Sequence, residues 1–293
     1  MVRPYAVKGR KKPKKRPRVE EEEEEKEEQQ QEENDEAVSE KENEETLENE
    51  EKGESTAEDE RKAEEAIEEM PGIPIAPRVQ DPKKKPGVIF VLERACLEFA
   101  KVGKTYQILN SDDHANFLKK QNRNPADYRP DIIHQALLAI LDSPLTKAGR
   151  LQALYVRTEK GVLFEVKPHV RMPRTFKRFC GLMLQLLQNL SITASGKREK
   201  LLNVIKNPVT RHLPVNSRRI GLSYSSEKMV QMRDYVAAAS DDVNLVFVVG
   251  AMAHGKIDND YTDDFISISN YPLSAACCLG RICNALEHKW NIL

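Results

Sequence analysis

The chain has 293 residues and a formal net charge of −1, a length that allows one large domain or two small ones. The near-zero sum hides three regions: residues 1–19 hold nine Lys/Arg and no acidic residue, and residues 20–70 hold 27 Asp/Glu against five Lys/Arg. That leaves 32 basic and 20 acidic residues for 71–293. A basic body suits a polyanionic partner, because Lys and Arg that neutralise phosphates release condensed counterions. Charge alone leaves ordinary solvated surface charge open as the alternative.

Several classes of protein are excluded by what the sequence lacks. It has neither an apolar signal core at its start nor a run of eighteen apolar residues, so we expect no membrane partner and a soluble, intracellular protein. None of the five cysteines forms a CxxC pair, which argues against both a zinc site and a disulfide framework. A reducing compartment is therefore expected.

The first 86 residues contain no motif for catalysis or ligand binding, so we interpret them from their composition alone. The basic cluster within 1–19 favours a nuclear import signal, with a solubilising tail as the alternative. Residues 20–70 are Glu-rich and nearly free of aromatic residues, so they cannot bury enough apolar surface to fold, and we expect disorder. Five prolines within 71–86 predict an extended linker, so a folded domain should span 87–293.

The folded part should alternate strands and helices. Apolar runs and periodicity predict strands over 88–92, 106–109, 151–156, 162–166, 220–224 and 245–249, with Lys160-Gly161 as the turn of the third and fourth. Helices are predicted over 131–141, 175–190, 227–239 and 274–290, and after a cap at 111–113 towards Lys120. This alternation predicts an α/β domain with a largely parallel sheet, whose ligand crevice lies at the carboxyl ends of its strands.

A glycine-bearing loop follows the strand at 245–249. It reads GAMAHGK (250–256) and satisfies the spacing of a phosphate-binding loop. That interpretation fails on Ile257, which stands where Mg²⁺ ligation needs Ser or Thr, and on the aspartates that follow. The loop instead suits close backbone approach to a neutral adenosine, because glycine has no Cβ in the way. A nucleoside triphosphatase is the weaker alternative.

A second loop, ISNYPLS (268–274), precedes the last helix. Its Ser and Asn side chains offer hydrogen bonds, Pro272 stiffens the turn, and Ser274 can cap the helix. By itself the segment is better interpreted as an ordinary helix entry.

Together these loops and several longer stretches resemble one family. The stretches are RPDIIHQALLAILDSPLTKAG (129–149), VRMPRTFKRFCGLM (170–183), LLNVIKNPVTRHLP (201–214), VFVVGAMAHGK (246–256), SISNYPLSAA (267–276) and WNIL (290–293). They resemble the pseudouridine N1-specific methyltransferases of small-subunit ribosome biogenesis, which belong to the SPOUT class. The resemblance covers residues 87–293.

The resemblance implies a fold and a donor site. The fold is α/β with a C-terminal trefoil knot, a rare exception to the usual topology rules, and the enzyme is a homodimer whose pockets lie near the subunit interface. The donor is S-adenosyl-L-methionine. Carried onto this chain, its binding residues are Ser226, Gly250, Gly255, Ile268, Ser269, Asn270, Tyr271, Pro272 and Leu273.

The resemblance also implies an RNA-binding surface formed by Arg171, Arg174 and Arg178, with a solvated helix face as the alternative. Arginine suits this role because its planar fork can hold a phosphate through two hydrogen bonds. By the same resemblance, Arg129 and Asp131 lie next to the target base. Asp131 is the candidate that positions the base or accepts its proton, and Arg129 the candidate that stabilises the developing anion.

We therefore expect methylation of N1 of a pseudouridine in small-subunit ribosomal RNA, without a metal. The protein should act in the nucleus and nucleolus, on a ribosomal RNA precursor and beside ribosome-assembly proteins. A noncatalytic assembly factor that binds the same RNA is the alternative function.

Overall fold

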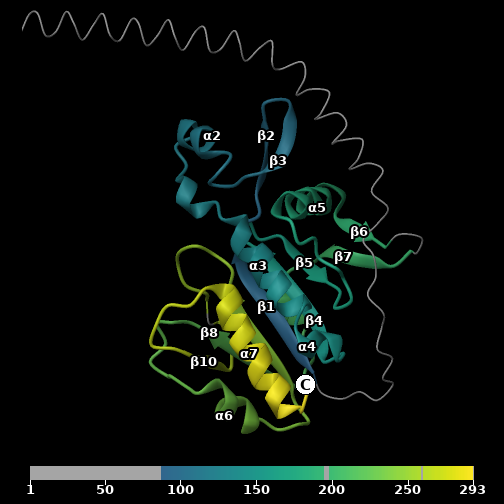
Figure 1. The fold of residues 1–293 in the computed structure, drawn as a ribbon, viewed down its shortest axis with the longest axis vertical. Coiled ribbons are helices and arrows are strands. Elements are labelled where there is room, and N and C mark those ends of the chain that lie inside the picture. Colours follow the sequence, from purple (N-terminus) through teal and green to yellow (C-terminus); the bar gives the residue numbers. More distant parts are fainter. Residues whose placement is uncertain (1–86, 195–197, 259, 293) are drawn as a thin grey trace, which may run out of the picture. The chain divides into compact units, whose positions relative to one another are not determined.

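The computed structural model describes residues 87–292, with the exception of 195–197 and 259 (Figure 1). The predicted basic tail (1–19), acidic tract (20–70) and Pro-rich linker (71–86) all lie outside the described residues. Within the described ranges, no helix is long and apolar enough to cross a membrane.

The described residues are organised around a sheet of eight strands in the order β10-β8-β9-β1-β4-β5-β7-β6. The first five strands of that order run parallel, and β5, β7 and β6 add to them antiparallel. A separate hairpin pairs two further strands, β2 (Phe99–Val102) and β3 (Thr105–Ile108). The bounds of the large sheet's strands are β1 (Val88–Ala95), β4 (Leu151–Thr158), β5 (Leu163–Val166), β6 (Ser191–Thr193), β7 (Lys200–Ile205), β8 (Ser217–Leu222), β9 (Asn244–Gly250) and β10 (Asp264–Ile266).

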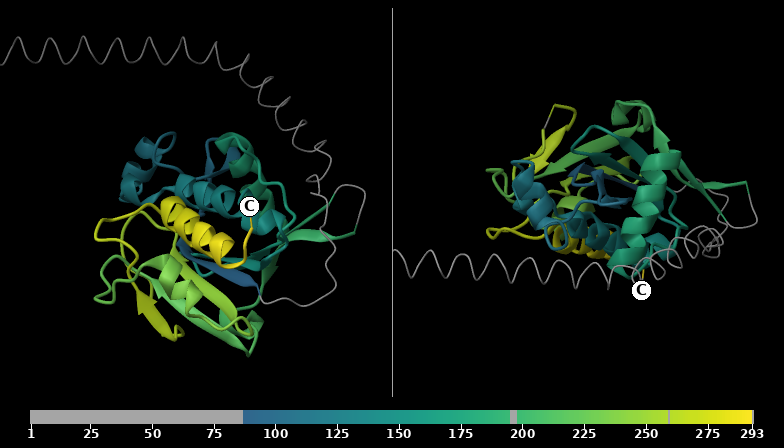
Figure 2. Two further views of the ribbon diagram at one scale, coloured as in Figure 1. Left: turned by 60° about the horizontal axis from the view of Figure 1, so that its bottom comes forward. Right: turned by 90° about the horizontal axis from the view of Figure 1, so that it is seen from above.

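Helices cover one face of the sheet. Figures 1 and 2 show α3 and α7 side by side across it, and α7 also contacts α4 and α6. The helices are α2 (Ala115–Lys120), α3 (Pro130–Leu141), α4 (Pro144–Lys147), α5 (Phe176–Asn189), α6 (Met232–Ala237) and α7 (Ala275–Lys289), with short 3-10 turns η1 (Pro125–Asp127) and η2 (Val209–His212).

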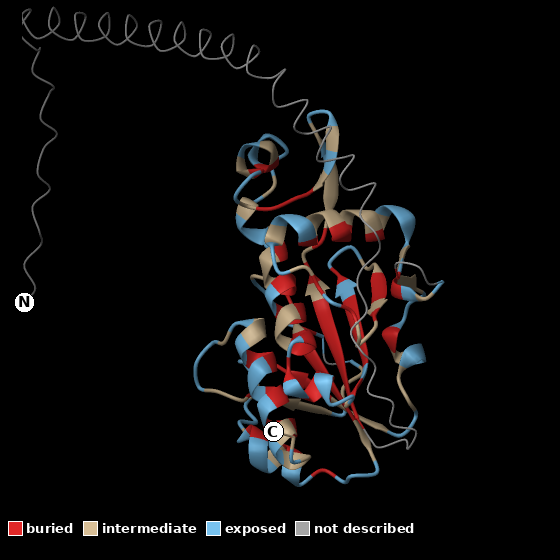
Figure 3. Cartoon of the chain, turned by 45° about the vertical axis from the view of Figure 1, so that its right-hand side comes forward, coloured by how far each residue is buried: buried red, intermediate tan, exposed pale blue. Residues whose placement is uncertain are grey.

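The central strand β1 is buried on both faces, as its unbroken apolar run requires. Phe90 and Leu92 point into the main core beneath the helices, whereas Ile89 and Val91 point to the opposite face. Among the described residues, no α-helix contributes to the core on that second face, where loop residues such as Ile257 cover the strands. The strands therefore form the red interior in Figure 3.

Most of the predicted elements are confirmed, and so is the largely parallel sheet, in which five of the eight strands run parallel. The strands β2, β6, β7 and β10 were not predicted, and the predicted strand at 106–109 belongs to the small hairpin as β3. The predicted cap at 111–113 is wrong: His114 is the N-cap of α2 and makes no side-chain cap bond. The cap by Ser274 is confirmed, because its hydroxyl accepts a hydrogen bond from the amide of Cys277.

The predicted helix at 227–239 is too long. The structure has only α6, because the backbone before it pairs with the chain that leaves β10. The amide of Ser267 donates to the carbonyl of Lys228, and the amide of Val230 donates to the carbonyl of Ser267. A partner that is distant in the sequence thus overrides a local helical preference.

Candidate functional site

A cavity of about 500 Å³ opens at the carboxyl ends of the parallel strands. The loops after β8, β9 and β10 form its wall together with the first turns of α3 and α7. This is the edge at which open α/β sheets bind ligands, and the volume falls in the range of small-molecule sites, roughly 300–1,000 Å³. The prediction of a crevice at this edge is confirmed.

Most of the predicted donor residues lie in this wall. Gly250 and Gly255 contribute from the loop after β9, and five residues of the loop after β10 contribute with them: Ile268, Ser269, Tyr271, Pro272 and Leu273. The two predicted loops are therefore neighbours in space although β10 separates them along the chain.

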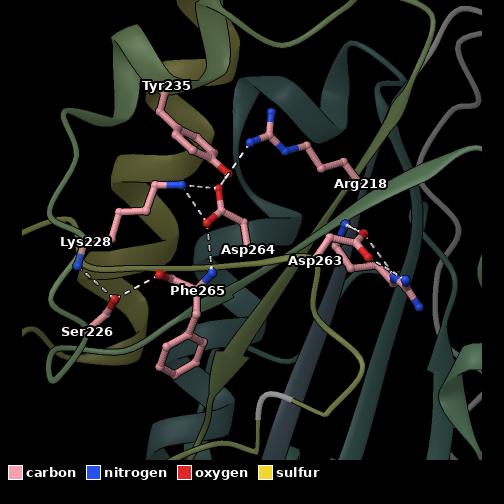
Figure 4. A network of polar contacts seen from close by, with 8 residues as sticks. Arg218, Ser226, Lys228, Tyr235, Asp263, Asp264 and Phe265 are labelled. Atoms are coloured by element: carbon pink, nitrogen blue, oxygen red, sulfur yellow. Dashed lines mark hydrogen bonds and ion pairs between the residues drawn. The ribbon is translucent and has the colours of Figure 1, made fainter.

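Two predicted residues do not line the cavity. Asn270 is exposed beside the wall. The hydroxyl of Ser226 donates a hydrogen bond of 2.8 Å to the carbonyl of Phe265 and so ties the loop after β8 to β10 (Figure 4). The structure places Ser223, Tyr224 and Ser225 in the wall instead. That loop carries no motif, so the available signal was its position after a parallel strand.

Serine hydroxyls shape the loop after β10. Ser267 is buried, and its hydroxyl donates to the carbonyl of Ser269 at 2.9 Å. The hydroxyl of Ser269 in turn accepts from the amide of Tyr271 at 3.0 Å. These local bonds satisfy backbone groups where no strand or helix can, and the loop holds its form without regular structure.

A polar network anchors the outer edge of the sheet (Figure 4). The carboxylate of Asp264, at the start of β10, accepts hydrogen bonds from Lys228 at 2.7 Å, Tyr235 at 2.6 Å and Arg218 at 3.1 Å. Burial by itself would raise the pKa of Asp264, but the bonds from Lys228 and Tyr235 bring it down to about 2. One carboxylate thus joins β8, the loop after it and α6 to β10.

We expect this network to make the stability of the protein depend on acid pH. Because the pKa of Asp264 in the folded chain lies below its ordinary value of 3.8, the stabilisation is complete above that value and is lost as the pH falls towards 2. The difference corresponds to about 2 kcal/mol. Asp264→Asn should lower the free energy of unfolding by about that much at pH 7 and flatten its decline between pH 4 and 2.

Urea denaturation of both proteins across this pH range measures the effect. Asp242→Asn is the matched control, since the exposed Asp242 carboxylate makes no ion pair with the described residues. An Asp264→Asn protein as stable as the control would contradict the role of the network.

Arg129 and Asp131 face each other in the cavity wall at the start of α3. Their side chains form a two-pronged ion pair, with Nε to Oδ1 at 2.8 Å and Nη2 to Oδ2 at 2.7 Å. The hydrogen bonds from Arg129 hold the pKa of Asp131 below its usual range. Asp131 is therefore a carboxylate at neutral pH and a weak proton acceptor.

The three predicted RNA-binding arginines lie outside the cavity, on and just before α5. All three are exposed, and Arg174 forms an ion pair of 3.0 Å with Asp142 at the end of α3. Neither Arg171 nor Arg178 makes an ion pair or side-chain hydrogen bond within the described ranges.

The arginine segment is docked on α3. His134 of α3 donates through Nε2 to the carbonyl of Pro173 at 2.7 Å, and its ring stacks on Phe179 with the centroids 4.4 Å apart. The helix that carries Arg129 and Asp131 at its start therefore also positions the exposed arginines.

The structure argues against a phosphate-binding loop at 250–256. In such a site a helix follows the loop and aims its amides at the phosphates. Here the described residues after Lys256 lead into β10 without a helix. Ile257 is buried against the sheet. Among the described residues, no group of three or more His, Cys, Asp or Glu is arranged to hold a metal ion.

Comparison with known proteins agrees with this arrangement. The model of the EMG1/NEP1 methyltransferase family matches residues 90–287. The chain is 53% identical over 206 residues to "Ribosomal RNA small subunit methyltransferase NEP1" of Mus musculus, covering 70% of this chain and 83% of that protein. It is 52% identical over 203 residues to the protein of the same description, nep-1, from Caenorhabditis elegans, covering 69% and 87%.

A solved structure shares the fold. The crystal structure of Archaeoglobus fulgidus Nep1 bound to S-adenosylhomocysteine superposes with a TM-score of 0.53 at 19% identity, over 70% of this chain and 99% of that one. With the family model matching about two thirds of the residues, the assignment is direct: the chain belongs to the EMG1/NEP1 methyltransferase family.

Proposed function

We propose that this protein transfers a methyl group from S-adenosyl-L-methionine to N1 of a pseudouridine in small-subunit ribosomal RNA. Its family membership supports the methyl transfer and the class of RNA. The observation that carries the proposal is the single cavity wall that joins the two glycine- and serine-bearing loops to the Arg129–Asp131 pair. A donor bound on the loops would face a base bound at the pair.

The residues present fit the donor. A Cβ at Gly250 would lie 2.9 Å from the Cε of Met252, so glycine there lets the side chain of Met252, itself a wall residue, pack against the backbone. Gly255 has a φ of +107°, a conformation open to glycine and strained for other residues. We assign Gly250, Gly255 and the segment 268–273 to donor binding, with Asn270 at its rim and Ser226 supporting the wall through Phe265.

The sulfonium of the donor supplies an already activated methyl group, so the protein's own task is positioning. Asp131, held as a carboxylate by Arg129, is suited to accept a hydrogen bond from an N–H of the target base. The N1 proton passes through that hydrogen bond to Asp131 and from there to solvent water, while N1 takes the methyl group and S-adenosylhomocysteine leaves. Arg129 brings positive charge to the side where the base becomes anionic as it loses this proton. Arg171, Arg174 and Arg178 hold the flanking phosphates, and the target is a loop nucleotide turned out of its stack.

The same proposal includes the trefoil knot. After β10 the chain runs parallel to the segment 228–230, to which Ser267 is hydrogen-bonded, before α7 packs against α3 and α6. This close pairing of the chain after β10 with the loop after β8 supports the proposal.

We further propose a homodimer whose interface lies near the cavity. Large apolar side chains are exposed on the loops around it: Tyr224, Met229 and Tyr271. A solution mass of twice the chain mass by light scattering is expected; the mass of one chain would contradict the dimer.

In the cell, the protein would act in the nucleus and nucleolus on a ribosomal RNA precursor, together with assembly proteins. The basic tail supports that location by its charge alone. The test of the enzymatic function is calorimetry with S-adenosyl-L-methionine, followed by transfer of labelled methyl to small-subunit RNA. Binding and transfer are expected; RNA binding without donor binding would instead favour a noncatalytic assembly factor.

A further inference from the structure

Two consecutive residues at the end of β1 contact the loop between β9 and β10 at three points. We call residues 251–263 the β9–β10 loop. The carbonyl of Glu93 accepts from the amide of Ala251 at 2.8 Å, at the start of the loop. Arg94 donates through Nη1 to the carbonyl of Lys256 at 2.9 Å, in its middle. The hydroxyl of Tyr261, near its end, donates to the Glu93 carboxylate at 2.6 Å.

Arg94 is itself fixed from the other side. Its Nε and Nη2 donate to the two oxygens of Glu159, both at 2.9 Å, so one guanidinium links the residue after β4 to the β9–β10 loop. The guanidinium also packs on Gly255, where an added Cβ would lie 2.8 Å from Nη1. Arginine's planar fork can satisfy both partners at once, which a lysine cannot.

The backbone at Arg94 has an unfavourable conformation that these contacts maintain. Its φ is +57°, in the left-handed region that is unfavourable for a residue with a side chain. The position falls where the register of β1 against β4 shifts, between Leu92 and Ala95. Such strain persists where surrounding contacts over-determine the conformation.

The held residues are those that line the cavity. Met252, Ala253 and Gly255 belong to its wall and lie between the first and second contact points, and Lys256, at the second point, belongs to the wall too. Neither Glu93 nor Arg94 lines the cavity. Both residues therefore contact the loop on the side that faces away from the cavity.

We propose that Glu93 and Arg94 are positioning residues that preorganise the β9–β10 loop for the methyl donor. The inference rests on the proposed function, because it assumes that the donor binds on this loop. A loop released from these contacts would have to be ordered when the donor binds, and the entropy lost in ordering its side chains and backbone would weaken donor binding. Weaker donor binding with unchanged RNA binding should follow.

The experiment measures the Kd of S-adenosylhomocysteine by calorimetry on the full chain, and the Kd of a target stem-loop separately without donor. Arg94→Ala should raise the Kd of S-adenosylhomocysteine about tenfold. Tyr261→Phe, which removes one hydroxyl, should raise it by a smaller factor, and Arg94→Lys should fall between Arg94→Ala and the wild type. The Kd of the stem-loop should stay unchanged in all three.

Arg123→Ala is the matched control. Arg123 pairs with Glu98 at 2.7 Å and is 36% exposed, against 37% for Arg94, but it does not touch the β9–β10 loop. The Arg123→Ala protein should bind S-adenosylhomocysteine with the same Kd as the wild type. Should Arg94→Ala be poorly folded, as judged by its thermal midpoint without ligand, Tyr261→Phe and Arg94→Lys carry the test.

The outcomes separate this inference from the function on which it rests. A wild-type chain that binds no S-adenosylhomocysteine would contradict the proposed function itself. Wild-type binding together with unchanged binding by folded Arg94→Ala and Tyr261→Phe would overturn the positioning role alone. An equal loss of affinity for the stem-loop would overturn it too, because that would indicate a general structural defect.

Discussion

Asp131→Asn is expected to slow methyl transfer about 100-fold in a single turnover, with the affinity for the donor unchanged. The carboxylate lies in the cavity wall, and both of its oxygens are engaged by Arg129. An asparagine keeps the shape but loses the charge and one of the two accepting oxygens, so Arg129 keeps at most one weaker hydrogen bond and the base no longer meets a carboxylate. Misplacement of a reacting group by about 1 Å is enough for a loss of that size.

The matched control lies at the other end of the same helix. Asp142→Asn also removes one partly exposed carboxylate that pairs with an arginine, but outside the cavity. At saturating RNA its single-turnover rate should equal that of the wild type. An Asp131→Asn protein with unchanged rate and unchanged RNA affinity would rule out the proposed role of Asp131.

Replacing Arg171, Arg174 and Arg178 together by alanine should weaken RNA binding about 100-fold at roughly 0.1 M salt. For single-stranded RNA each neutralised phosphate contributes about 0.7 to the slope of log K against log salt, so the slope should become shallower by about 2. Binding of S-adenosylhomocysteine should not change, since none of the three arginines lines the cavity.

The single variants should differ from one another. Arg174 must give up its ion pair with Asp142 to reach a phosphate, so Arg174→Ala should cost less affinity than Arg171→Ala or Arg178→Ala. A triple variant that removes the same charge elsewhere, Arg211, Arg233 and Arg281 to alanine, is the control. An equal loss of affinity in both triple variants would contradict a specific RNA-binding role for Arg171, Arg174 and Arg178, because it would show that they contribute only their net charge.

The sequence predicts those parts of the fold that depend on local pattern. The central strands β1 and β9 were predictable because a short, unbroken apolar run must be buried on both faces. By contrast, β10 has three residues and begins with the ionised Asp264, so it exists through its pairing with β8 rather than through its own pattern. The shortening of α6 has a similar cause, a pairing with Ser267 that no local window reveals.

The site, like the fold, has parts that local sequence pattern predicts and parts that depend on contacts distant in the sequence. In the sequence, Gly250 and Gly255 predict a loop whose backbone a ligand can approach closely, and the resemblance adds the segment 268–273 to the same donor site. The structure places both loops in one cavity wall, except for Asn270. The wall residues 223–225 carry no signal beyond following β8. Nor does the sequence reveal that Arg94, which has a left-handed backbone at the end of β1, is hydrogen-bonded to the β9–β10 loop, because that contact spans 162 residues.

The most direct test of the proposed reaction uses two stem-loops of identical sequence, one with pseudouridine and one with uridine at the same loop position. Pseudouridine exposes an N1–H, whereas in uridine N1 is bonded to the sugar and has no proton to lose. With S-adenosyl-L-methionine and the full chain, we predict methyl incorporation into the pseudouridine stem-loop alone. Methylation of both stem-loops, or of neither by a chain that binds donor and RNA, would contradict N1 methylation of pseudouridine.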